Sequence, residues 1–104
     1  MSEIDDATMQ ALQAATFRRL IHHLMQDRPE VQNIDMMNLT GFCRNCLGRW
    51  LAGAAAEAGV DLGKEDARTL VYGMPYDQWK AQNQSDATDA QKAAFNDAIK
   101  AHEG

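Results

Sequence analysis

Residues that break helices are sparse in this chain, and they divide it into a few long segments. There are only two prolines, Pro29 and Pro75, and seven glycines among 104 residues. Apolar residues recur at helical spacing, and no run shows the strict alternation of a half-buried strand. We therefore predict an all-α fold, a compact bundle of four to five helices. It should form a single domain over residues 1–104, with about residues 1–5 and 101–104 frayed.

The longest predicted helix covers about residues 35–59, from a capping aspartate to a terminating glycine, and is expected to be the central element. One broad face of it is apolar, with Met36, Leu39, Cys43, Cys46, Leu47, Trp50 and Ala54. A preceding helix should run from Asp5 or Asp6 to about Asp27. Three more are predicted over residues 64–72, over about 75–84, and from Thr88, which forms a capping box with Gln91.

Charge and hydropathy exclude several classes of protein. A formal net charge of −5 and a sequence pI near 5.0 disfavour nucleic-acid binding. No apolar run approaches the roughly 18 residues of a membrane span, and the acidic N-terminus is unlike a secretory signal. We therefore expect a cytoplasmic protein with reduced thiols. The arginines, Arg44 and Arg49 among them, are expected at the solvated surface.

The pair Cys43 and Cys46 is the main chemical feature, and three interpretations of it stay open. Packing as small buried hydrophobes is favoured. A metal, zinc or iron, would need further ligands, either from His22 and His23 across a helical hairpin or from the same pair of a second chain. A redox role is disfavoured because thiols in the middle of a helix lack the helix N-terminus that lowers a thiol pKa.

Two further groups of side chains are candidate sites. Polar residues that could bind an anion or an amide occur before and within the long predicted helix: Asn33, Asp35, Asn38, Asn45 and Arg49. Tyr72, Tyr76 and Trp79 surround a Gly-Met-Pro turn and could line a ligand pocket. For the aromatic group, the favoured interpretation is a satellite core. For the polar group, it is a hydrogen-bonded network.

Two stretches, Val31 to Leu47 and Val71 to Lys80, resemble a bacterial family known as domain of unknown function 1244. The resemblance extends over roughly residues 17–91 and implies a short helical bacterial protein with no assigned activity. The resemblance implies that some positions of this chain serve either a site or a folding constraint that the family shares. These positions are Asn33, Asp35, Asn38, Phe42, Cys43, Arg44, Asn45, Cys46 and Gly73 to Tyr76.

The leading functional hypothesis is a small cytosolic accessory protein that acts by binding, with a metal at the cysteine pair as one form of it. One alternative is a small enzyme that uses the cysteines or the Asn/Asp/Arg cluster on a polar substrate. Another is a structural module that forms a homodimer through apolar helix surface, since a chain of this length buries only a modest core.

Overall fold

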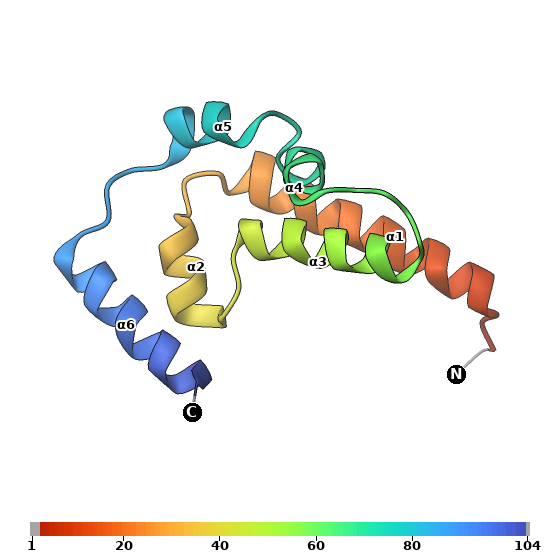
Figure 1. Cartoon of the computed structure of the whole chain (residues 1–104), viewed down its shortest axis with the longest axis horizontal. Coiled ribbons are helices and arrows are strands. Elements are labelled where there is room, and N and C mark those ends of the chain that lie inside the picture. The colour runs from red at the N-terminus through yellow and green to blue at the C-terminus, as the bar shows by residue number, and fades with distance from the viewer. Residues whose placement is uncertain (1–2, 104) are drawn as a thin grey trace.

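The computed structural model describes residues 3–103, with side chains described through Ile99. This part of the chain contains six α-helices, one π-helical segment and no strand, which confirms the all-α prediction. The elements, shown in Figure 1, are α1 (Asp6–His22), η1 (His23–Asp27), α2 (Asn33–Thr40), α3 (Arg44–Glu57), α4 (Lys64–Tyr72), α5 (Tyr76–Asn83) and α6 (Asp89–Glu103).

The first helix begins where the sequence predicts. The Asp5 carboxylate accepts a hydrogen bond of 2.7 Å from the Thr8 backbone N–H, which caps α1. The helix continues through the π-helical turn η1, which is capped by Arg28 just before Pro29. The apolar face predicted for this segment packs on the core through Phe17, Leu20, Ile21 and Leu24.

The predicted central helix over residues 35–59 is wrong as a single element, because the chain turns sharply at Gly41. This glycine has a left-handed φ of 82°, and its N–H bonds to the Met37 carbonyl at 3.0 Å. Such a glycine ends a helix. Cys43 is then fully extended and caps α3, which begins at Arg44. The cysteine pair therefore lies at the start of a helix rather than in its middle.

Arg44, expected at the surface, is instead completely buried, with an exposed fraction of 0%. Each of its five N–H groups donates a hydrogen bond of 2.6–3.3 Å. The acceptors are the backbone carbonyls of Leu24, Arg28 and Val31 and the side-chain oxygen of Asn33. The expectation of a solvated side chain is therefore wrong, because the guanidinium has exchanged water for a full set of protein acceptors.

The acceptors explain why a cation is stable in this position. Two of the carbonyls belong to the C-terminal end of η1, where helix carbonyls lack partners and the helix dipole is negative. The ring of Trp79 covers the guanidinium, with its centroid 4.9 Å from Cζ. Arg44 thus joins the start of α3 to the end of η1, to the connector before α2, and to α5.

The core consists of two adjoining clusters of buried side chains. The larger contains Met25, Leu47, Val71, Tyr72 and Trp79, and the smaller contains Met36, Cys43 and Cys46. Helices α3 and α4 approach closely at Gly48, where an added Cβ would lie 3.1 Å from the Arg68 Cα. Three residues of the predicted apolar face are exposed: Leu39 by 86%, Trp50 by 55%, and the smaller Ala54. The break at Gly41 explains why a single helical register could not place that face.

The last helix docks on α2 through one glutamine. Gln91 forms the predicted capping box with Thr88, with hydrogen bonds of 2.8 and 3.1 Å. Its side-chain N–H₂ also donates to both oxygens of Asp35 at 3.0 and 3.1 Å. Its backbone carbonyl accepts a bond of 3.2 Å from Asn38. Figure 1 shows α6 beside α2, far from the N-terminal half of α1.

The remaining helix boundaries follow the sequence closely. The element α4 spans the predicted residues 64–72 and ends at Gly73, whose φ is 70°. Pro75 precedes α5, as predicted. The predicted frayed C-terminal end is partly helical, because α6 continues through Glu103. Residues 1–2 and 104 lie outside the described residues.

The overall shape is elongated, with extents of 48 × 33 × 28 Å and a radius of gyration of 15.9 Å. A compact chain of this length would have a radius of gyration of about 13 Å. The N-terminal half of α1 and all of α6 account for the extension in Figure 1. Among the described helices, none combines the length and the apolar character that a membrane span requires.

Replacing Gln91 with glutamate should detach α6 from α2, and because an isolated helix of this length is marginally stable, the detached α6 should open more often. Glutamate keeps the capping box, but its carboxylate would face that of Asp35, at a cost of about 2 kcal/mol. Hydrogen exchange should then accelerate in α6 and stay unchanged in α3. Adding Asp35→Asn restores a donor and should slow the exchange again. Equal exchange in α6 of wild type and Gln91→Glu would contradict this account.

Candidate functional site

A chain of hydrogen bonds runs from buried Arg44 to the molecular surface. Arg44 donates to Asn33 at 2.9 Å, and the Asn33 amide donates to the Tyr72 hydroxyl at 3.1 Å. Tyr72 donates to Asn45 at 2.8 Å. Because Arg44 fixes the oxygen of Asn33, the donor direction of this relay is defined from its buried end. The first links are short and lie in low dielectric, where aligned bonds strengthen one another.

The outer end of the same relay is weakly bonded. The Asn45 amide donates to the Tyr76 hydroxyl at 3.5 Å, and Tyr76 donates to Gln84 at 3.3 Å. Both distances exceed the usual range for strong hydrogen bonds of these types. The Asn45 amide, the Tyr76 hydroxyl and the Gln84 amide are therefore held in place by long hydrogen bonds only.

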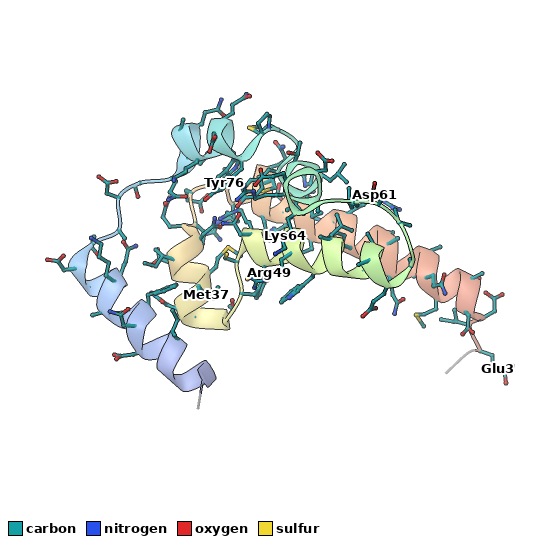
Figure 2. The ribbon with its side chains drawn as sticks, in the orientation of Figure 1. Glu3, Met37, Arg49, Asp61, Lys64 and Tyr76 are labelled. Atoms are coloured by element: carbon teal, nitrogen blue, oxygen red, sulfur yellow. The ribbon has the colours of Figure 1, made fainter. Side chains whose placement is uncertain are left out.

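These weakly bonded groups line a cavity of about 390 Å³ between α2, the start of α3, α5 and the linker to α6. Figure 2 labels two of its lining residues, Met37 on α2 and Tyr76 on α5. The full lining comprises Gln32, Asn33, Ile34, Met37, Cys43, Asn45, Tyr76, Gln84, Ser85, Asp86, Ala87 and Phe95. Its volume falls within the range of small-molecule sites.

One member of the cysteine pair, Cys43, forms part of this wall. Cys43 and Cys46 are both free thiols with exposed fractions of 7% and 2%. Cys43 caps α3 and lines the cavity, while Cys46 accepts a hydrogen bond of 3.3 Å from the guanidinium of Arg49. The sequence-based argument against redox chemistry placed these thiols in mid-helix, and that placement is wrong.

Burial nevertheless favours the protonated forms of the Cys43 thiol and the Tyr72 hydroxyl. Burial raises the pKa of the Cys43 thiol, and the adjacent Cys46 raises it further, whereas N–H groups at the start of α3 oppose both effects. Burial also raises the pKa of the Tyr72 hydroxyl. Cys43 therefore faces the cavity as a thiol, and Tyr72, which is buried and bonded to the cavity residue Asn45, stays a phenol.

The two histidines proposed as metal ligands are not brought to the cysteines. The Nδ1 atoms of His22 and His23 lie 3.6 and 3.4 Å from the Asp27 carboxylate. Among the described residues, no group of three or more His, Cys, Asp or Glu side chains is placed to hold a metal ion. A four-ligand site of two cysteines and two histidines is therefore not assembled within this chain.

The predicted polar group separates into three roles. Asn33 and Asn45 belong to the relay, and Asp35 and Asn38 hold α6. Arg49 is exposed and bonds to the sulfur of Cys46. The Asn38 side-chain oxygen is buried and has no hydrogen-bond partner. The predicted group therefore does not converge on one point.

The aromatic residues divide in a similar way. Tyr72 and Trp79 are buried and pack edge to face, with centroids 4.9 Å apart. They belong to the larger core cluster itself and not to a satellite of it. Tyr76 is half-buried and lines the cavity.

Sequence reasoning missed the central role of Arg44 and the contribution of the α5–α6 linker. The glycine at position 41 is the one local signal that could have relocated Arg44, since a glycine after a short amphipathic segment marks a helix end. No local pattern indicates that Ser85, Asp86 and Ala87 would lie against residues some forty to fifty positions earlier.

A model of the family described as "Protein of unknown function (DUF1244)" matches residues 31–97, more than half of the chain. The matched span contains every residue that lines the cavity, both cysteines and Arg44, but begins after η1. No curated protein matches the chain.

The raised pKa values predict a loss of stability at alkaline pH. Folded Cys43 and Tyr72 hold their protons more tightly than at their ordinary pKa values of 9.0 and 10.0. Their contribution is therefore fully present below about pH 9 and is lost as the pH rises through the folded pKa values. Urea unfolding at pH 7.5 and pH 10 should show a smaller drop for Cys43→Ala than for wild type. The same drop in both proteins would contradict the assignment to Cys43.

Proposed function

Because this chain belongs to the DUF1244 family, whose description assigns no activity, we infer its function from the candidate site. We propose that it binds a small neutral polar molecule. The ligand would occupy the cavity between α2 and the α5–α6 linker. The protein would act as an accessory binding protein in the bacterial cytoplasm, where two free cysteines stay reduced.

The single observation that carries this proposal is the weakly bonded outer end of the relay inside the cavity. The Asn45 amide, the Tyr76 hydroxyl and the Gln84 amide are positioned by the buried relay but separated by 3.3–3.5 Å. A ligand with adjacent donors and acceptors could exchange these long bonds for shorter ones. Preorganised groups of this kind bind at a low entropic cost.

The lining also favours a particular class of ligand. Side-chain amides pair with groups that carry a donor beside an acceptor, as in a carboxamide or a nucleobase. Ile34, Met37 and Phe95 supply an apolar wall for a flat ring. The net charge of −5 and the carboxylate of Asp86 at the cavity disfavour anions.

Binding is favoured over catalysis by the ionisation of the site. A nucleophilic cysteine requires a lowered pKa, whereas the pKa of Cys43 is raised by burial. The pKa of Tyr72 is raised as well, which keeps it from acting as a base. An enzyme at this cavity would need a stronger base or nucleophile than these two groups supply.

Filling the cavity should abolish binding. Ala87 is half-buried in its wall, whereas Ala90 is exposed on α6 outside it. A panel of neutral carboxamides and nucleobases should contain compounds that raise the Tm of wild type and of Ala90→Trp, but not that of Ala87→Trp. A ligand at ten times its Kd stabilises by about 1.4 kcal/mol, which corresponds to about 6 °C or more for a chain of this size.

Two outcomes of this thermal-shift measurement would contradict the proposed function. One is the absence of any compound in the panel that stabilises wild type. The other is an equal rise in Tm for Ala87→Trp and Ala90→Trp, which would place the ligand elsewhere on the molecule.

A further inference from the structure

Four sulfur-containing side chains gather at the junction of α2 and α3. Met36, Cys43 and Cys46 form a buried cluster with exposed fractions of 7%, 7% and 2%. Half-buried Met37 packs against the same cluster and, like Cys43, lines the cavity. The sequence supplies this grouping from two short segments that the turn at Gly41 folds together.

The geometry at the start of α3 places the two thiols side by side. The Cys46 N–H donates to the Cys43 carbonyl at 3.0 Å, which closes a tight turn between them. The α-carbons joined by such a turn lie within about 7 Å, and both cysteine side chains belong to the same buried cluster. Cys43 opens onto the cavity, so an ion in solution can reach the pair from that side.

We infer that this sulfur cluster is a site for a soft monovalent metal ion, Cu(I), with Cys43 and Cys46 as thiolate ligands and Met37 as the adjacent thioether. Thiolates and thioethers are the ligands that select Cu(I). Zinc instead needs three or four N, S or O ligands, and no such group forms among the described side chains. Met37 and Cys43 lie in the wall of the same cavity, but copper would bind to sulfur atoms, whereas the organic ligand would bond to Asn45, Tyr76 and Gln84. The copper titration and the thermal-shift measurement therefore test the two sites separately.

The charges around the pair support the loaded state. On binding, each thiol loses one proton to solvent and forms one S–Cu bond, while copper stays Cu(I) and no electron is transferred. The resulting unit carries one negative charge. The guanidinium of Arg49 lies 3.3 Å from the Cys46 sulfur and can neutralise it. Cys43 also occupies the N-cap position of α3, at the positive end of the helix dipole.

The test is a Cu(I) titration of the full chain under anaerobic conditions, in competition with a colorimetric Cu(I) chelator. Wild type should retain one copper per monomer, and X-ray absorption should show only sulfur as the nearest neighbours of the metal. Cys43→Ala should lose the retained copper. Met37→Leu should weaken retention by about tenfold, whereas the matched control Met9→Leu, on exposed α1, should not.

Several results would overturn the copper site. These are retention by Cys43→Ala equal to that of wild type, nitrogen or oxygen among the nearest neighbours, or one metal shared by two chains. Stoichiometric retention of Zn(II) against a chelator of matched strength would overturn its selectivity. Circular dichroism of each variant checks the fold, and the absorption measurement on wild type decides the ligands even where a variant fails to fold.

Discussion

The fold depends on one buried cation whose acceptors are almost all backbone carbonyls. Arg44 connects four segments through its five hydrogen bonds and the ring of Trp79. A guanidinium suits this position because its planar fork can satisfy several acceptors at once, which an ammonium cannot. A chain that buries two small clusters gains little stability from apolar packing alone. The fully hydrogen-bonded guanidinium of Arg44 therefore accounts for a larger share of the stability of this fold.

Arg44 also sets the position of the candidate site. It is the first residue of α3, so fixing it fixes Cys43 at the helix start and Asn45 one residue later. Through Asn33 it orients the relay that ends at Tyr76 and Gln84. The interior of the relay is rigid and satisfied, whereas its end in the cavity is loosely bonded. The hydrogen bonds thus lengthen toward the cavity, and the long bonds at that end mark the part of the network available to a ligand.

Local signals in the sequence were sufficient for much of the fold. The caps at Asp5 and Thr88, the stop at Gly73 and the turn at Pro75 each depend on residues a few positions apart. The break at Gly41 was missed because isolated glycines are often tolerated within helices. The relay could not be predicted, since four of its five bonds join residues 11 to 39 positions apart and no periodicity records such contacts. The cysteines were recognised, but their chemistry depended on that break.

The most direct test of this account is the free energy of unfolding in urea of Arg44→Lys compared with Arg18→Lys. Lysine keeps the charge but offers only three donors from a single point. We predict that Arg44→Lys lowers the free energy of unfolding by about 3 kcal/mol, because buried carbonyls lose their partners. Arg18 is exposed, and its replacement should change stability by less than about 0.5 kcal/mol. Equal stability of the two variants would contradict the central role of Arg44.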